Sequence, residues 1–126
     1  MAGGGGSGEV RGGSEAAPAE QGYEYLADVA GLLDGELRAV MKASGEEICL
    51  FNFRGTIGAV GNVCTHAEFP MSDGTLKHDG VIECVWHGAQ FDCRSGAVCR
   101  GPAVDALPVY EVRLEGGRVL VGPKRR

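Results

Sequence analysis

Two short segments of the sequence carry one cysteine and one histidine each. A single residue separates Cys64 from His66, two residues separate Cys84 from His87, and seventeen residues lie between the segments. A zinc finger generally groups two cysteines at one knuckle and two histidines further on. Because cysteine and histidine alternate here, two metal ions fit better, with both thiolates on one ion and both imidazoles on the other. Iron–sulfur chemistry provides such a site, since in one class of [2Fe–2S] centre two His replace two Cys on one iron.

The residues around these positions extend the pattern into two boxes, CTH followed by MSDG, and CVWHGAQFD. These boxes resemble the cluster-binding loops of Rieske proteins. The stretch from about Tyr23 to Pro123 is similar to a stand-alone Rieske ferredoxin of bacterial ring-hydroxylating dioxygenase systems. The resemblance implies one [2Fe–2S] cluster per chain, with Cys64 and Cys84 on the inner iron and His66 and His87 on the outer iron.

The sequence differs from the Rieske proteins of cytochrome complexes at four positions. Those proteins carry a bracing pair of cysteines where this chain has Phe69 and Trp86, and a Ser and a Tyr where it has Ala89 and Phe91. The differences favour the ferredoxin branch. Without the two hydroxyls, we expect a reduction potential near the low end of the Rieske range, about −150 mV. Two glycines are expected to allow close backbone approach, with N–H groups aimed at the sulfurs: Gly74 and Gly88.

The resemblance implies an electron carrier without catalytic activity of its own. It would take electrons from an NAD(P)H-dependent flavoprotein reductase and pass them to the terminal oxygenase of an aromatic-ring dioxygenase system. We expect a monomer that docks near His66 and His87, with Phe69–Met71 either as part of the docking patch or as ordinary loop packing. One alternative is the small Rieske subunit of an assimilatory nitrite reductase, and another is a zinc-stabilised binding module.

Composition restricts the partners and the compartment. The formal net charge is −5, and residues 23–123 hold fourteen acidic against eight basic side chains. Nucleic-acid binding is not expected, because it requires a basic surface. No apolar run reaches the length of a membrane span, and no signal-peptide pattern is present. We therefore expect a cytoplasmic protein whose five cysteines serve as thiols rather than as disulfides.

The other candidate residues receive structural interpretations. Cys49 lies in an apolar run and is expected in the core. Cys93 and Cys99 flank a short turn and could face each other, but we expect two free thiols rather than a disulfide. His78 has no neighbouring cysteine and is expected in an exposed loop. Trp86 could either shield the cluster or simply pack in the interior.

Alternating apolar residues separated by glycine turns predict an all-β fold, because no long 3.6-residue period is present. By resemblance this is the Rieske fold, an antiparallel β-sandwich with an inserted cluster-binding subdomain at about 62–102. The preceding residues 1–22 are glycine-rich and expected to form a disordered leader, and residues 124–126 a solvated basic tail. The expected strands are 23–29, 36–43, 46–53, 56–63, 81–86, 90–92, 97–98, 109–114 and 118–121.

Overall fold

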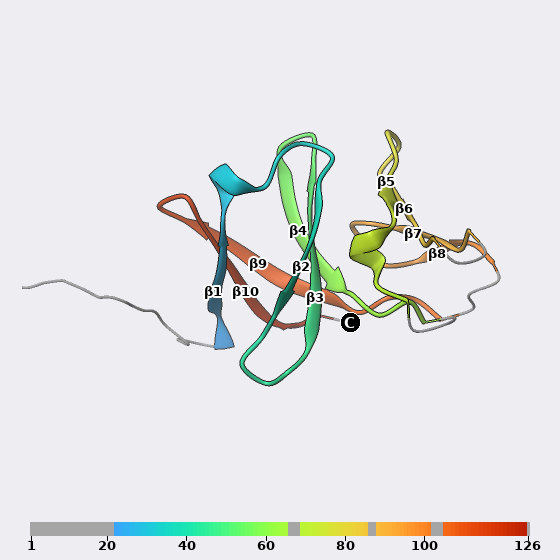
Figure 1. Ribbon diagram of the computed structural model, residues 1–126. Helices are drawn as coiled ribbons and strands as arrows, with labels where there is room; N and C mark the ends of the chain where they lie inside the picture. The colour runs from blue at the N-terminus through green and yellow to red at the C-terminus, as the bar shows by residue number, and fades with distance from the viewer. Residues whose placement is uncertain (1–21, 66–68, 86–87, 102–104, 126) are drawn as a thin grey trace, which may run out of the picture.

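The computed structural model describes residues 22–65, 69–85, 88–101 and 105–125. In this part of the chain, ten strands form two antiparallel sheets (Figure 1). The larger sheet has the order β1-β10-β9-β4-β3-β2, and the smaller has the order β5-β6-β7-β8. The elements are β1 (Glu24–Asp28), η2 (Val29–Gly31), β2 (Leu37–Met41), β3 (Glu47–Phe53), β4 (Thr56–Gly61), η3 (Met71–Asp73), β5 (Thr75–Leu76), β6 (Val81–Glu83), β7 (Gln90–Asp92), β8 (Val98–Arg100), β9 (Val109–Glu115) and β10 (Arg118–Lys124).

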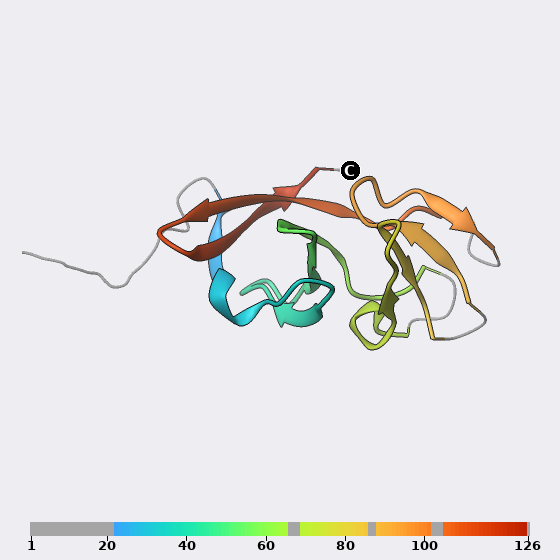
Figure 2. The ribbon, with the colours of Figure 1, turned by 90° about the horizontal axis from the view of Figure 1, so that it is seen from above.

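The all-β prediction is confirmed, and the larger sheet folds back on itself. Figure 2 shows β9 and β10 (orange to red) in one layer, with β2 and β3 (teal) in another layer facing them. A side-chain hydrogen bond links the two layers: Lys42, directly after β2, donates through Nζ to the carbonyl of Gly122 in β10 over 2.9 Å. A core of buried side chains fills the space between the layers: Leu32, Ile48, Leu50, Ala59, Tyr110, Val119 and Val121.

Strand β3 contributes to two cores at once. Successive side chains of a strand point to opposite faces, so Ile48 and Leu50 enter the core between the layers, whereas Cys49 and Phe51 enter a second core. All four side chains are at most 2% exposed. The second core lies where the larger sheet meets the smaller one, and it confirms the expected burial of Cys49.

The predicted hairpin turns are present, and their backbone angles explain their sequences. Arg54 (φ 54°) and Gly55 (φ 90°) join β3 to β4, and Gly116 and Gly117, both also at positive φ, join β9 to β10. Positive φ at both central residues is the type I′ geometry, which matches the twist of the flanking strands. Arg54 adopts it without being glycine, and its N–H donates to Asp34 Oδ1 over 2.8 Å.

The C-terminal strand is longer than predicted. It was expected to end at Val121, but β10 continues to Lys124, which pairs with Tyr110 after an irregularity in the register. The N–H of Arg125 also donates to the carbonyl of Val109 over 2.6 Å. The expectation of a solvated tail from residue 124 was therefore wrong for the backbone of these two residues, although their side chains are exposed.

The smaller sheet is inserted in the chain between β4 and β9, as expected. The chain returns to the larger sheet through the segment 105–108, which contacts both parts: Leu107 N–H donates to Gly96 O, and Gly61 N–H donates to Pro108 O, each over 2.9 Å. Helices in the described residues are short 3₁₀ turns, and none is long and apolar enough to cross a membrane.

Candidate metal centre in two matched loops

The first cysteine lies at the start of a loop that extends from the end of β4. Val63 and Pro70 form an antiparallel bridge at the neck of this loop. Inside the neck, the N–H of Cys64 donates to the carbonyl of Phe69 over 2.9 Å. These two interactions fix the entry and the exit of the loop, and Cys64 is its first residue.

The second cysteine lies in a loop of the same construction between β6 and β7. Glu83 pairs with Gln90 at the neck, and the N–H of Cys84 donates to the carbonyl of Ala89 over 2.8 Å. In both loops the bridge joins the residue before the cysteine to the sixth residue after it. In both, the hydrogen bond reaches the fifth residue after the cysteine.

The two cysteines are buried in one environment. Cys64 and Cys84 are each 1% exposed and belong to the same cluster of buried side chains, together with Met71, Phe91 and Leu107. Thiolates are soft donors suited to iron–sulfur clusters, and an apolar surrounding limits access of water to them. The two buried cysteines therefore fit the thiolate half of a [2Fe–2S] site.

The imidazole half of the predicted site lies outside the described residues, because His66 and His87 fall in the gaps 66–68 and 86–87. Trp86 lies there as well, so its two interpretations stay open. Elsewhere in the described chain, no three His, Cys, Asp or Glu side chains come together as a metal site. The assignment of the two histidines as ligands remains a prediction.

Asn62 anchors the first loop to the rest of the protein. It is 2% exposed, and its side-chain Oδ1 accepts the N–H of Ser72 over 2.8 Å. Its main-chain carbonyl accepts the N–H of Met71 over 2.6 Å, and its own N–H donates to the carbonyl of Glu47 over 3.0 Å. One buried residue thus joins β3, the beginning of the first loop and the 3₁₀ turn that follows the loop. No motif in the sequence signalled this role.

A second tie reaches the same loop from the returning chain. The hydroxyl of Thr65 donates to the main-chain carbonyl of Asp105 over 2.7 Å. Thr65 lies between Cys64 and the predicted ligand His66, so the returning segment holds the loop at the point where two ligands are expected.

The predicted glycine roles are only partly correct. A side chain at Gly74 would place its Cβ 2.1 Å from the carbonyl oxygen of Glu83, so the close backbone approach is real. The N–H of Gly74, however, donates to the carbonyl of Met71 over 2.9 Å, and the expectation that it points at a cluster sulfur was wrong. Gly88 has φ 71°, which favours glycine in the second loop.

The apolar residues near the loops are arranged differently from the prediction. Met71 is fully buried in the core, so of the two interpretations given for Phe69–Met71, packing holds for this residue and the docking patch does not. Phe69 and Pro70 are half-buried. Among the described residues of the two loops, Val63 (42% exposed) and Val85 (57% exposed) have exposed apolar side chains, and each directly neighbours a cysteine in the sequence.

The remaining cysteines and histidine have structural roles. Burial raises the pKa of the Cys49 thiol to about 12 and that of Cys93 to about 11. Both stay protonated at neutral pH and are poor ligands or nucleophiles. Cys93 is buried, Cys99 is exposed, and both are free thiols, as predicted. His78 is exposed in a loop, also as predicted.

Ala89 and Phe91, the positions expected to lack donor hydroxyls, are both fully buried. They lie in the same buried cluster as Cys64 and Cys84. Serine or tyrosine hydroxyls at these positions would therefore lie in the same apolar environment as the two thiols.

Comparison with known proteins shows which family the chain is similar to. The family model described as "Rieske [2Fe-2S] domain" matches residues 24–111. The ferredoxin subunit of 3-phenylpropionate/cinnamic acid dioxygenase from Escherichia coli K12 is 35% identical over 97 residues, covering 77% of this chain and 90% of that protein.

Solved structures show the same similarity. The ferredoxin of carbazole 1,9a-dioxygenase from Nocardioides aromaticivorans IC177 is 30% identical with a TM-score of 0.76, covering 81% of this chain and 98% of that one. A ferredoxin in complex with the oxygenase of carbazole 1,9a-dioxygenase is 27% identical with a TM-score of 0.76, at coverages of 82% and 94%. A structure from Mycobacterium tuberculosis, assigned as an NADH-dependent nitrite reductase small subunit, is 25% identical with a TM-score of 0.73, at coverages of 80% and 94%.

Proposed function

Because the chain belongs to the Rieske [2Fe–2S] domain family, we propose that it is a ferredoxin that carries single electrons to the terminal oxygenase of a ring-hydroxylating dioxygenase system. The cluster, one per chain, supplies the one-electron chemistry, and the protein supplies binding, orientation and electrostatics. The observation that supports the proposal most directly is the pair of buried cysteines at the same position of two matched loops. The 35% identity to a dioxygenase ferredoxin subunit along 90% of its length favours the dioxygenase assignment.

Four side chains would hold the cluster. Cys64 and Cys84 would bind one iron as thiolates from inside the buried core. His66 and His87 would bind the other iron, in keeping with the two-His, two-Cys ligation of Rieske centres. The hydrogen bonds at the loop necks keep the two cysteines in fixed positions, so that little rearrangement accompanies uptake or loss of an electron.

Electron exchange would take place where the two loops reach the surface. Val63 and Val85, which neighbour the two buried cysteines in the sequence, have exposed apolar side chains, and Phe69 and Pro70 add half-buried apolar surface. Small interfaces are typical of the short-lived encounters of redox proteins. A flavoprotein reductase and the terminal oxygenase would use this patch in turn, and the two partners would then compete for it.

In the proposed function, catalysis takes place in the partner oxygenase and not in this chain. A cavity of about 190 Å³ lies between β4 and β9 and is lined in part by Arg94 and Arg125, and neither Cys64 nor Cys84 lines it. The cysteines are packed among apolar side chains instead. An organic substrate would accordingly react in the partner oxygenase.

The test begins with metal and sulfide analysis of the purified protein. We expect about two irons and two sulfides per chain and, in the reduced state, the low average g value of His-ligated clusters. The protein should then transfer electrons from a reductase to a Rieske oxygenase of an aromatic substrate, followed as NADH consumption coupled to product formation. A colourless protein with one zinc per chain would contradict the proposal and support the zinc-module alternative.

The similarity to a nitrite reductase small subunit supports a second candidate function. In that case the chain would form a lasting complex with a large siroheme-containing subunit. Affinity purification from the native host, followed by absorption spectroscopy of the co-purified protein, separates the two candidates. A stable siroheme complex would favour the nitrite reductase, and transient binding to an oxygenase would favour the ferredoxin.

A further inference from the structure

A carboxylate lies directly beneath the second cysteine loop. Glu83 is the last residue of β6 and immediately precedes Cys84. Its side chain is half-buried, and Oε2 accepts a hydrogen bond from Gln90 Nε2 over 3.3 Å. A Cβ placed on Gly88 would lie 3.3 Å from the same oxygen. The carboxylate therefore lies against the neck of the loop, close to Gly88 near the end of the loop.

No Lys or Arg in the part of the chain that the structure describes forms an ion pair with this carboxylate. Among the described residues, ion pairs with Lys or Arg involve Glu36, Glu46, Asp92, Glu111 and Glu115, and none involves Glu83. The hydrogen-bond donor that faces Glu83 is a neutral amide. The neck of the first loop, by contrast, is formed by Val63 and Pro70 and carries no charge. The two necks thus differ by one carboxylate, which belongs to the neck of the second loop.

We propose that the Glu83 carboxylate lowers the reduction potential of the centre held by Cys64 and Cys84. The inference rests on the cluster site proposed above. A nearby negative charge favours the oxidised cluster, which is the more positive state, over the reduced one. The interaction is strong where the charge is withdrawn from water, because the effective dielectric constant is lower there and salt screens the charge less. Glu83 acts through its field alone and needs no contact with iron.

This influence is separate from that of Ala89 and Phe91, where the chain lacks hydroxyl donors. A missing donor removes stabilisation of the reduced state, whereas a carboxylate adds a repulsive interaction to it. The Glu83–Gln90 pair also explains why the adjacent strands keep two polar side chains in partly buried positions at the edge of the apolar core.

The test compares variants by protein-film voltammetry at neutral pH. Glu83→Gln keeps the shape of the side chain and removes its charge, so the potential should rise. Glu115→Gln is the matched control, because it removes one carboxylate at the exposed end of β9. Figure 1 shows the β9–β10 turn at the opposite end of the molecule from β6 and β7. The potential of this control should stay at the wild-type value. Glu83→Asp keeps the charge and should lie between wild type and Glu83→Gln.

A second variant leaves Glu83 in place. Gln90→Lys puts a cation beside the carboxylate and should also raise the potential. Because the cation acts on the cluster by itself, the Glu83→Gln, Gln90→Lys double variant is measured beside it, and its potential should be higher than that of Gln90→Lys. Salt should weaken the shift only slightly, because Glu83 is half-buried. If Glu83→Gln matches Glu115→Gln and the double variant matches Gln90→Lys, all with intact clusters, Glu83 has no tuning role, although the proposed function stands. If wild-type protein binds no iron and sulfide, the proposed function fails, and this inference fails with it.

Discussion

The hydroxyl of Thr65 reaches the main-chain carbonyl of Asp105, forty residues away in the sequence, over 2.7 Å. This hydrogen bond joins the loop that presents Cys64 to the segment that carries the chain back to the larger sheet. The segment is itself fixed on both sides, by Gly96 and by Gly61. Movement of the first loop is therefore restrained by contacts made after the insert has ended.

Replacing Thr65 by Val should speed loss of the cluster. The substitution removes the hydroxyl, and a neutral hydrogen bond contributes about 1 kcal/mol, which corresponds to a roughly fivefold faster loss at 1.36 kcal/mol per tenfold. The measurement is bleaching of visible absorbance in the presence of an iron chelator. Thr65→Ser keeps the hydroxyl and serves as the control. Equal bleaching rates for Thr65→Val and wild type would show that the tie to Asp105 does not hold the loop.

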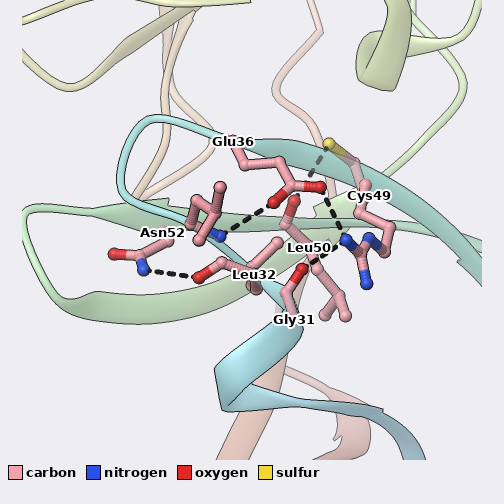
Figure 3. Close-up of polar contacts among 8 residues, drawn as sticks. Gly31, Leu32, Glu36, Cys49, Leu50 and Asn52 are labelled. Carbon is pink, nitrogen blue, oxygen red and sulfur yellow. Dashed lines mark hydrogen bonds and ion pairs between the residues drawn. The ribbon is translucent and has the colours of Figure 1, made fainter.

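Asn62→Leu should reduce both stability and the order of the site. It leaves the partly buried N–H of Ser72 without its acceptor, which costs about 1 kcal/mol in urea unfolding, and it should broaden the EPR signal of the reduced protein. Asn52→Leu is a control for buried asparagines. Figure 3 shows that Asn52 Nδ2 donates to the carbonyl of Leu32. Leu32 belongs to the core between the layers, whereas Cys64 and Cys84 belong to the other core. Its replacement should lower stability without altering the EPR signal, and identical EPR effects in the two variants would contradict the assigned role of Asn62.

His66→Ala and His87→Ala should each abolish the visible spectrum of the bound cluster, because each removes a predicted ligand of the outer iron. His78→Ala is the control. Its main-chain carbonyl, rather than its ring, accepts a hydrogen bond from Arg54, over 3.2 Å. Iron analysis and absorption spectra check the result, and a full iron content in either of the first two variants would exclude that histidine as a ligand.

Cys49 should make the free energy of unfolding depend on pH in the alkaline range. Burial raises the pKa of its thiol from 9.0 to about 12, so above pH 9 the unfolded chain releases a proton that the folded chain keeps. The free energy of unfolding then falls as pH rises, at about 1.4 kcal/mol per pH unit between about pH 9 and 12.

Urea unfolding of wild type and Cys49→Ala at pH 8 and pH 10.5 tests this effect. The variant should be less stable at pH 8, because a buried side chain has been shortened, and the gap should narrow at pH 10.5. Cys99→Ala, at an exposed thiol, should follow the wild-type curve. A gap of constant size would show that Cys49 does not contribute to the pH dependence.

Ala89→Ser and Phe91→Tyr should each raise the reduction potential from a wild-type value of about −150 mV. A hydrogen bond to a charged group contributes about 1.5–3 kcal/mol, which amounts to roughly 60–120 mV for a one-electron couple at about 59 mV per tenfold. Voltammetry checks the shift. Both positions are fully buried, so circular dichroism and iron content should accompany the measurement. A wild-type potential above zero would contradict the role given to these two positions.

Local patterns were sufficient to predict most of the strands, the hairpin turns at Arg54-Gly55 and Gly116-Gly117 and the burial of Cys49, because each depends on alternation or on backbone angles. The two-residue strand β5 (Thr75–Leu76) was missed, since it is too short to show alternation. The burial of Met71 could not be read from its neighbours, since Pro70 and Ser72 suggest a surface turn and only the distant core decides its environment. Asn62 belongs to no motif, and its role depends on partners up to fifteen residues away.

The structure of β10 explains why the predicted end of the C-terminal strand, at Val121, was wrong. Gly122 and Pro123 signal the end of a strand, but an irregularity in the pairing with β9 accommodates them. A Cβ at Gly122 would lie 2.6 Å from the ring of Tyr23, so glycine is required there for packing. At the candidate site, the two cysteines expected as ligands lie in one buried cluster, whereas His66 and His87 stay predictions. The exposed valines beside the cysteines, and the carboxylate of Glu83 under the second loop, emerged only from the three-dimensional arrangement.

The two-sided burial of β3 has a consequence for how the protein unfolds. Cys49 and Phe51 belong to the core under the loops, and Ile48 and Leu50 to the core between the layers. Neither core can melt while the other keeps this strand in place. Unfolding should therefore follow one cooperative transition, and binding of iron and sulfide near Cys64 and Cys84 should raise the melting temperature of the whole domain rather than that of the insert alone.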